Sequence, residues 1–302
     1  MYDVIIIGMG PAGMNAALYA KRSGLNVLIL EKSIPGGLIN ITNKVENYLG
    51  NGISTGKELV EKMLEHIKNF DIEYKRESVS EIVDEGKIKI VKTNKAEYKA
   101  KALILASGRV PKRGGNEKIT RLEGKGISYC AVCDAPFYKD KVVGIIGGGN
   151  SAFDEGLYLS DFAKKLYMFI RGEEIKADEI FVNKAKAKEN IEILLNSNVT
   201  DLIEKDGKLC AVEINNKDKI NIDGLFLYIG YSPSTNYFKD LNITDETGYI
   251  IVNEKMETKI PGIFAAGDII KKDIYQIITA ASDGSIAALS AKKYIKNLDK
   301  NQ

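Results

Sequence analysis

Two cysteines followed by an acid are the residues of this chain best suited to covalent chemistry. Cys130, Cys133 and Asp134 form a Cys-x-x-Cys-Asp motif. Two thiols at this spacing can close a reversible disulfide, and exchange with a partner disulfide passes through a mixed disulfide. Asp134 is placed either to move the proton that leaves or joins a thiolate or to cap a helix or turn. We therefore predict that Cys130 and Cys133 carry out a dithiol–disulfide exchange, with Asp134 as the candidate acid–base group beside them.

A metal site is the other common use of a Cys-x-x-Cys pair. Structural zinc needs about four nitrogen or sulfur ligands. Outside the pair the chain has one more cysteine, Cys210, and one histidine, His66. Cys210 lies in a predicted strand, where cysteine usually serves as a small buried apolar residue, and His66 lies in a polar, helix-like stretch typical of a surface. We therefore predict no metal site, and a zinc-binding module is the weakest alternative.

A glycine turn near the N-terminus indicates dinucleotide binding. Gly8 permits a tight turn, Gly10 lets a pyrophosphate approach the backbone at a helix N-terminus, and Gly13 lets the helix pack against the strand. Glu31 follows at the end of the next predicted strand, where a ribose-binding acid is expected. The pattern predicts a strand, a helix and a second strand at residues 4–7, 14–22 and 26–30.

A second unit of the same kind begins in the middle of the chain. Gly147, Gly149 and Ala152 form a tolerated variant of the turn. After its second strand an NAD site would carry an acid, and an NADP site would carry arginines for the 2′-phosphate, whereas this chain has Arg171 and, further on, Lys176. Both a working nucleotide site and one that has lost its function stay open. The expected strand, helix and strand are at residues 142–146, 153–162 and 165–170.

The two glycine turns predict an α/β fold with two dinucleotide-binding, Rossmann-like domains, the second inserted into the first. The first domain is expected to be discontinuous, with residues 1–112 and 244–302, and the inserted domain, which contains the redox cysteines, to span 113–243. Gly114 and Gly115 form the expected flexible point of the first connection.

The composition is that of a globular protein without a strong charge bias. Of 302 residues, 44% are hydrophobic and 28% are charged, and the net charge is +2. This gives no indication of nucleic-acid or membrane binding, and no apolar run approaches the roughly 20 residues of a membrane span. The chain enters its first strand directly, so we expect no signal peptide and a cytoplasmic location, where cysteines stay reduced unless they do redox work.

Motifs spread in order over nearly the whole chain resemble those of the low-molecular-weight thioredoxin reductases. They are residues 8–13, 35–37, 45–48, 106–108, 128–134, 137–138 and 262–268, followed by Gln276-Ile277. The resemblance implies an FAD-dependent enzyme, expected as a homodimer, that passes electrons from FAD through the Cys130–Cys133 disulfide to thioredoxin. The FAD-binding residues that it implies are Gly8, Gly10, Gly13, Glu31, Gly37, Asn47, Gly108, Asp268, Gln276 and Ile277.

The same resemblance assigns roles to the redox residues. Cys133 would be the thiol next to the flavin, Cys130 the interchange thiol that attacks thioredoxin, and Asp134 the acid–base group. In this family the inserted domain rotates between one orientation over the flavin and another toward the partner. Gly114 and Gly115 suit one hinge of that rotation.

The chain departs from the family at the nucleotide site. Members that use NADPH have His-Arg-Arg and a further arginine where this chain has Ile170-Arg171-Gly172 and Lys176, and a lysine cannot replace the bidentate fork of an arginine. The pattern resembles the ferredoxin-dependent branch of the family, makes NADPH a doubtful cofactor and favours reduced ferredoxin, an acidic protein, as the electron donor. Ordinary solvated surface explains the basic clusters at least as well as ferredoxin docking; they are Arg109, Lys112 and Arg113, and Lys271 with Lys272.

Two alternative functions stay open. The first is the same enzyme with NADPH as its donor, which Arg171 and Lys176 support. The second is a non-catalytic FAD-binding redox sensor whose partner responds to the state of the Cys130–Cys133 pair. Flavoproteins that reduce ferredoxin or flavodoxin lack a Cys-x-x-Cys, so the pair argues against that class.

Overall fold

The computed structural model describes residues 1–115 and 117–300, which form two compact units. The first unit consists of residues 1–110 and 232–302, and the second, residues 111–231, is inserted into it. Each unit is an α/β domain built on a sheet of mainly parallel strands. This is the architecture of two Rossmann-like domains that the glycine turns predicted.

The inserted unit ends earlier than the sequence indicated. The sequence predicted a second boundary at residues 243–244, whereas the chain enters the first unit again after Tyr231. Phe238 and Ile243 are only 2% and 3% exposed and belong to the apolar core of the first unit. Because these side chains are buried there, the segment 232–243 is part of the first unit.

The chain crosses between the units in two short strands that pair with each other, β7 (Arg109–Pro111) and β16 (Tyr231–Pro233). Next to them, the amide of Lys112 donates a hydrogen bond to the carbonyl oxygen of Gly230 at 2.9 Å. Gly114 and Gly115, the predicted flexible point of the first connection, lie within the inserted unit a few residues after the crossing, and their role as a hinge stays a prediction.

The first unit is built on a seven-stranded sheet in the order β3-β2-β1-β6-β5-β4, with β17 also paired with β6. Most of its strands are parallel, and β4 and β5 extend it as an antiparallel pair. Because β1 lies between β2 and β6, the chain order reverses there, and such sheets bind ligands at the carboxyl ends of the strands at that point. The strands are β1 (Tyr2–Ile7), β2 (Val27–Glu31), β3 (Glu73–Arg76), β4 (Val79–Glu85), β5 (Ile88–Thr93), β6 (Glu97–Leu105) and β17 (Ile263–Ala265).

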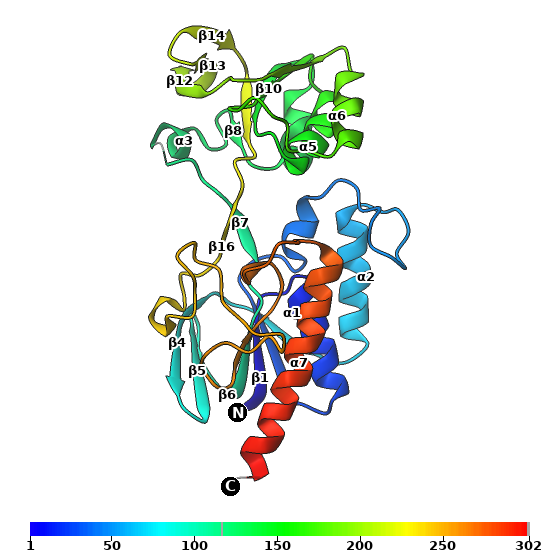
Figure 1. Ribbon diagram of the computed structural model, residues 1–302, viewed down its shortest axis with the longest axis vertical. Coiled ribbons are helices and arrows are strands. Elements are labelled where there is room, and N and C mark those ends of the chain that lie inside the picture. Colours follow the sequence, from blue (N-terminus) through cyan, green and yellow to red (C-terminus); the bar gives the residue numbers. More distant parts are fainter. Residues whose placement is uncertain (116, 301–302) are drawn as a thin grey trace. The chain divides into compact units, whose positions relative to one another are not determined.

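Two helices of the first unit, α1 (Pro11–Arg22) and α7 (Ile277–Lys300), pack side by side against the sheet (Figure 1). Their close approach depends on Gly284, because a Cβ there would lie 2.2 Å from the carbonyl oxygen of Ala12. The helix α2 begins after Thr55, which forms a capping box with Glu58. The remaining helical elements are α2 (Gly56–Lys68), η1 (Gly37–Ile41), η3 (Lys239–Leu241) and η4 (Gly267–Ile269).

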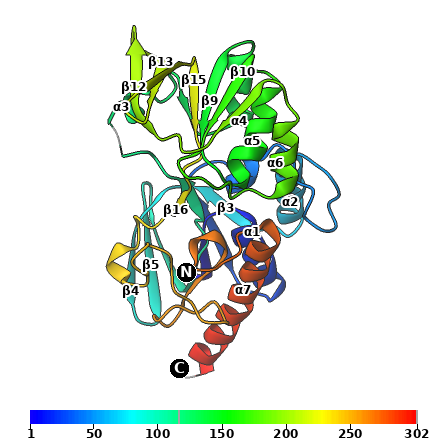
Figure 2. The same ribbon diagram turned by 45° about the horizontal axis from the view of Figure 1, so that its top comes forward.

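The inserted unit has a five-stranded parallel sheet in the order β11-β10-β9-β15-β8. Its helices α5 and α6 lie beside each other (Figure 2), and a small antiparallel sheet, β12-β13-β14, completes the unit. The strands are β8 (Ile127–Ser128), β9 (Val142–Ile146), β10 (Lys165–Phe169), β11 (Ile191–Leu194), β12 (Val199–Lys205), β13 (Lys208–Ile214), β14 (Asp218–Asn221) and β15 (Gly224–Leu227). The helices are α3 (Glu117–Leu122), α4 (Ala131–Asp134), η2 (Ala135–Tyr138), α5 (Asn150–Ser160) and α6 (Glu179–Lys186). Across residues 1–115 and 117–300, no helix has the length and apolar character needed to cross a membrane.

Candidate active site

The first glycine turn links β1 to α1 at the carboxyl edge of the first sheet. Gly8 has a φ of +103°, and a Cβ there would lie 2.3 Å from the carbonyl oxygen of Ala106. A Cβ on Gly13 would lie 1.9 Å from the carbonyl oxygen of Gly8, whereas a Cβ on Gly10 would meet nothing within 4 Å. Packing therefore requires glycine at Gly8 and Gly13, while the space above Gly10 is open to a ligand.

The N-terminus of α1 is suited to an anion. Gly10 is its N-cap residue, and among the described residues no side chain caps the helix and no acid lies in its first turn, so the helix dipole and first amides favour negative charge there. Gly36 lies beside the turn, since its amide donates to the carbonyl oxygen of Met9 at 2.8 Å. A Cβ on Gly37 would lie 3.6 Å from the Cα of Gly10. Together the two glycine segments frame a cradle for a pyrophosphate.

Glu31 ends β2 beside this cradle. Its Oε2 accepts a hydrogen bond from the amide of Met9 at 2.8 Å, and its Oε1 accepts one from the amide of Ser33 at 2.8 Å. The residue is only 9% exposed. Each carboxylate oxygen can accept a second hydrogen bond, so Glu31 retains the capacity to accept one from a ribose hydroxyl, and its ribose-binding role stays a prediction.

The strands β6 and β17 end at the same edge of the sheet. Gly108 follows β6 with a φ of +62° and has open space where a Cβ would lie. Asp268 follows β17, and its Oδ2 lies 3.1 Å from a guanidinium nitrogen of Arg109. The Arg109 guanidinium in turn lies 3.8 Å from the centroid of the Tyr275 ring. Asp268 is therefore fixed in orientation at the ligand edge of the sheet.

Two residues predicted to border the flavin meet in the structure although they are far apart in sequence. The Asn47 Nδ2 donates to the Gln276 Oε1 at 3.1 Å. Gln276 immediately precedes Ile277, the first residue of α7. The helix start that the resemblance implied is thus confirmed. The side chain of Gln276, just before the helix, is held by Asn47.

The first unit as a whole fits FAD. It offers an open pyrophosphate cradle over Gly10, a buried ribose-binding acid and a group of polar side chains at the same edge of the sheet. When bound, FAD supplies reversible two-electron redox chemistry. The residues that would hold it are Gly8, Gly10, Gly13, Glu31, Gly37, Asn47, Gly108, Asp268, Gln276 and Ile277.

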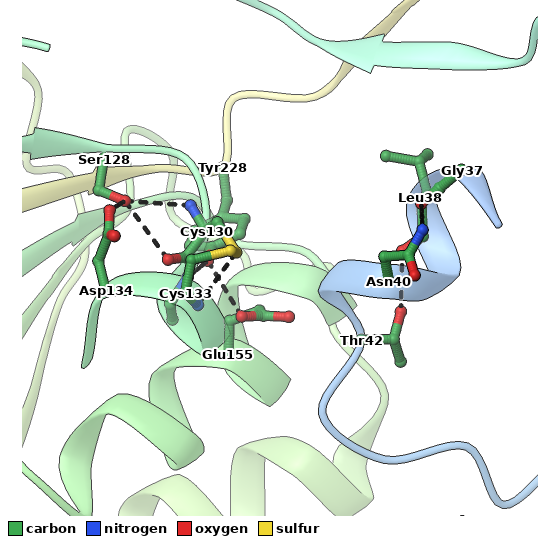
Figure 3. The surroundings of a disulfide bond; sticks show 11 residues. Gly37, Leu38, Asn40, Thr42, Ser128, Cys130, Cys133, Asp134, Glu155 and Tyr228 are labelled. Carbon is green, nitrogen blue, oxygen red and sulfur yellow. Dashed lines mark hydrogen bonds between the residues drawn. A yellow bond between two sulfur atoms is a disulfide. The ribbon is translucent and has the colours of Figure 1, made fainter. Parts of the chain in front are cut away.

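In the inserted unit, Cys130 and Cys133 form a disulfide, with their Cα atoms 5.4 Å apart (Figure 3). Cys130 is the N-cap residue of α4, and its Sγ accepts a hydrogen bond from the amide of Cys133 at 3.1 Å. Cys133 is exposed and Cys130 is half-buried. An amide directed at a sulfur at a helix N-terminus stabilises the thiolate form, so the pair is suited to reversible exchange.

Asp134 lies next to the disulfide and is linked to it through Ser128 (Figure 3). The Ser128 hydroxyl donates to the Asp134 Oδ2 at 2.6 Å and accepts a hydrogen bond from the Cys130 amide at 3.1 Å. Asp134 precedes η2, but within the described chain its side chain makes no capping hydrogen bond there. Instead of capping η2, the Asp134 carboxylate accepts its hydrogen bond from Ser128, beside the disulfide.

A second acid, which the sequence did not single out, approaches α4 from α5 (Figure 3). The Tyr228 hydroxyl donates to the Glu155 Oε2 at 3.3 Å and accepts a hydrogen bond from the Ala131 amide at 3.0 Å. Burial raises the pKa of Glu155 to about 7, and the neighbouring charge of Asp154 adds to this effect. Hydrogen bonds from Tyr228 and from the amides of Val132 and Ala131 act in the opposite direction.

The second glycine turn borders a cavity of about 290 Å³ within the inserted unit. Its lining includes Gly149, Asn150, Ser151 and Lys176. The loop with Lys176 is held there because its amide donates to the carbonyl oxygen of Gly148 at 2.8 Å. Arg171, in contrast, is exposed and does not belong to the lining in the described part of the chain. The turn is thus formed and open, with one cation beside it.

The third cysteine and the histidine lie away from these sites. Cys210 is in β13, as predicted, where it is half-buried and its Sγ donates to the carbonyl oxygen of Ile203 at 3.4 Å. His66 is exposed on α2, also as predicted. Residues 1–115 and 117–300 contain no group of three or more His, Cys, Asp or Glu side chains that could hold a metal ion.

Comparison with known proteins shows which family this chain resembles. Residues 2–284 match the family described as pyridine nucleotide-disulphide oxidoreductase. The chain is 44% identical to a thioredoxin reductase of Bacillus subtilis, over 99% of this chain and 96% of that protein. The structure of Lactococcus lactis thioredoxin reductase is 37% identical with a TM-score of 0.95, covering 98% of this chain and 100% of the other. A ferredoxin-flavin thioredoxin reductase of Clostridium acetobutylicum is 34% identical with a TM-score of 0.57, covering 99% of both chains.

Two dinucleotide-binding folds, with a redox disulfide on the inserted one, define a flavin-linked disulfide oxidoreductase. The chain belongs to the pyridine nucleotide-disulphide oxidoreductases and, within them, to the low-molecular-weight thioredoxin reductase family. The ferredoxin-dependent branch, which the sequence favoured, is a more distant structural neighbour than the Lactococcus lactis enzyme.

Proposed function

We propose that this protein is an FAD-dependent thioredoxin reductase that delivers electrons to thioredoxin through the Cys130–Cys133 disulfide. The disulfide itself supports this most strongly, because it lies at the start of α4 with Cys133 exposed and an amide directed at the Cys130 sulfur. Relatives that are 44% and 39% identical over nearly the whole chain are named thioredoxin reductases. Homodimerisation remains a prediction from the family resemblance.

Asp134 is the proposed acid–base group of the exchange. It reaches the Cys130 backbone through the Ser128 hydroxyl. The resemblance assigns attack on thioredoxin to Cys130 and the position next to the flavin to Cys133. The greater exposure of Cys133 favours the reverse order. Single Cys130→Ser and Cys133→Ser variants decide between them, because only the variant that retains the interchange thiol traps a mixed disulfide with thioredoxin.

We infer that a nicotinamide nucleotide is the electron donor. The cavity at the second glycine turn is open, Lys176 faces it, and among described residues no acid lies in the first turn of α5. These features favour a phosphate-bearing ligand. NADPH, which the sequence made doubtful, is therefore retained as a candidate cofactor.

Reduced ferredoxin, the donor that the sequence favoured, is the second candidate. The exposed position of Arg171 outside the cavity supports it, since only Lys176 then remains for a 2′-phosphate. The ferredoxin-linked relative from Clostridium acetobutylicum also supports it. The basic clusters give it little support, because most of their charges are already paired. In the first unit Arg109 pairs with Asp268, Lys272 with Asp283 and Lys271 with Asp245. In the inserted unit Arg113 pairs with Glu123 at 3.5 Å.

An anaerobic titration of the oxidised flavoprotein tests the donor. NADPH, NADH and reduced ferredoxin are added in separate cuvettes while the visible flavin absorbance is followed. Bleaching by a nucleotide, coupled to reduction of thioredoxin, is the expected result. Bleaching by ferredoxin alone would instead establish the second candidate.

The redox sensor remains the alternative of another class. It would bind FAD and change the state of Cys130–Cys133 without sustained turnover. Steady reduction of many equivalents of thioredoxin per enzyme molecule would exclude it. A single stoichiometric reduction with no further turnover would support it.

A further inference from the structure

A buried glutamate and a half-buried tyrosine lie against the redox helix and have no role in the exchange described above. Glu155 is 9% exposed on α5, and Tyr228 follows β15. The Tyr228 hydroxyl donates a hydrogen bond to Glu155 and accepts one from the Ala131 amide (Figure 3), and the Val132 amide favours the charged form of the Glu155 carboxyl, which lowers its pKa. Glu155 and Tyr228 therefore engage the first two amides of α4.

The third amide of the same turn belongs to the disulfide. The Cys133 amide donates to the Cys130 Sγ at 3.1 Å. An ionised Glu155 and a Cys130 thiolate would therefore place two negative charges on one turn of helix. Like charges that share a site disfavour each other's ionisation, and the two groups then titrate as a coupled pair.

We propose that Glu155, held by Tyr228, is a positioning residue that takes up one proton when the Cys130–Cys133 disulfide is reduced and releases it when the disulfide forms again. In the reduction, the sulfur–sulfur bond accepts two electrons and breaks. Cys130 leaves as a thiolate, Cys133 takes one proton, and the Glu155 carboxylate takes a second. A dithiol reductant supplies these two electrons and two protons, and oxidation by a partner disulfide returns them.

The surroundings of Glu155 are consistent with a proton held near neutral pH. The elements packed against α5 include α4, α6, β9 and β10. The groups that act most strongly on the carboxyl are Asp154 on its own helix, Tyr228, and the amides of α4, and burial sets the direction of the pKa shift. Among described residues, the titratable carboxyl of α4 and the titratable side chains of α6 and β10 are not in that set: Asp134, Glu179, Lys184, Lys186, Lys165 and Tyr167.

The test is the pH dependence of alkylation of Cys130 in the full chain. The protein is reduced with dithiothreitol, treated briefly with iodoacetamide at a series of pH values, and each modified cysteine is quantified by mass spectrometry. In Glu155→Gln we expect Cys130 to react about threefold to tenfold faster at about pH 7.5, the change for half to one pKa unit. At about pH 5.5 the wild type and the variant should react equally, because Glu155 is then protonated.

Two further variants separate charge from structure. Glu192→Gln removes a carboxylate of the same unit that is exposed and pairs with Lys165 at 2.8 Å, so its profile should match the wild type. Tyr228→Phe removes a hydrogen bond that favours the charged form of Glu155, so its profile should lie between those of the wild type and Glu155→Gln. If Glu155→Gln fails to fold, Tyr228→Phe still tests the proposal.

Two results would overturn the proposal. One is a Glu155→Gln profile that coincides with the wild type at every pH. The other is an equal acceleration at every pH, including about pH 5.5, which would indicate a structural change rather than a charge. The proposal rests on the proposed exchange reaction for its role in turnover, but the test needs no electron donor and no thioredoxin. Its failure and the failure of the proposed function are therefore distinguishable.

Discussion

Alanine substitutions in the first glycine turn should separate the role of the turn in folding from its role in binding FAD. In Gly13→Ala the new Cβ would lie 1.9 Å from the carbonyl oxygen of Gly8. Because the obstacle is backbone, the turn itself must move, and overpacking of this kind costs about 1–3 kcal/mol. We therefore expect Gly13→Ala to lower the free energy of unfolding by that amount.

Gly10→Ala should leave the fold intact and weaken the binding of FAD. Gly10 has φ −80° and ψ −172°, which alanine adopts readily, and its Cβ would meet nothing within 4 Å. Compared with glycine, alanine restricts the unfolded chain, which stabilises the folded protein, but it is a poorer N-cap residue. Because the two effects oppose each other, the net change in unfolding free energy should stay within about 0.5 kcal/mol. The methyl group projects into the pyrophosphate cradle, so FAD affinity should fall at least about tenfold, or about 1.4 kcal/mol.

Urea unfolding of the flavin-free variants, followed by circular dichroism, and FAD titration of each variant measure the two effects. If Gly10→Ala binds FAD as tightly as the wild type, the pyrophosphate does not lie over this residue and the assignment of the first turn is wrong. If Gly13→Ala is as stable as the wild type, the close packing of helix and strand at this turn is not what requires glycine.

Three further predictions concern other residues. Lys176→Ala should raise the KM for the nicotinamide nucleotide about threefold to tenfold with little change in kcat. The control Lys186→Ala, on α6 and outside the cavity lining, should leave this KM unchanged. Equal effects of the two variants would show that Lys176 does not bind the nucleotide. Gln276→Ala removes the hydrogen bond from Asn47 and should weaken FAD binding by about 1 kcal/mol. Adding Asn47→Ala to this variant should weaken FAD binding little further. Additive losses of affinity in FAD titrations would show that the pair does not act together. Burial opposes ionisation of Asp245, but hydrogen bonds from Thr247, Lys271 and Tyr249 lower its pKa to about 2 from 3.8, so the ionised form stabilises the fold above about pH 4 and this contribution is lost as pH falls through about 2. Asp245→Asn should therefore cost about 1–2 kcal/mol at pH 7 and progressively less between about pH 4 and 2 in urea titrations; a cost that does not change with pH would contradict this.

The sequence predicted the elements around the two glycine turns well because local rules determine them. Each buried strand reads as an apolar run that ends at a glycine, and the structure places β1 at Tyr2–Ile7 and β9 at Val142–Ile146. The boundary after Tyr231 was missed because Phe238 and Ile243 are apolar residues that could enter either core. Only the three-dimensional packing shows which unit buries them.

The part of the site that depends on distant residues could not be predicted in the same way. Tyr228 and Glu155 are 73 positions apart, and nothing local relates them. One signal was present for Glu155, which lies in the stripe of buried residues along α5 with Ala152, Gly156 and Leu159. An acid at helical spacing within an apolar stripe indicates a buried carboxyl that needs partners.

The most direct test of the proposed function follows electrons from the flavin to thioredoxin. The flavoprotein is photoreduced without oxygen, mixed with oxidised thioredoxin, and the free thiols of thioredoxin are counted while the flavin absorbance returns. We predict that the flavin is reoxidised as thioredoxin thiols appear, and that the double variant Cys130→Ser with Cys133→Ser retains FAD but transfers nothing. Thioredoxin reduced equally fast by the double variant, or left oxidised by the wild type, would contradict the assignment of Cys130–Cys133 as the route.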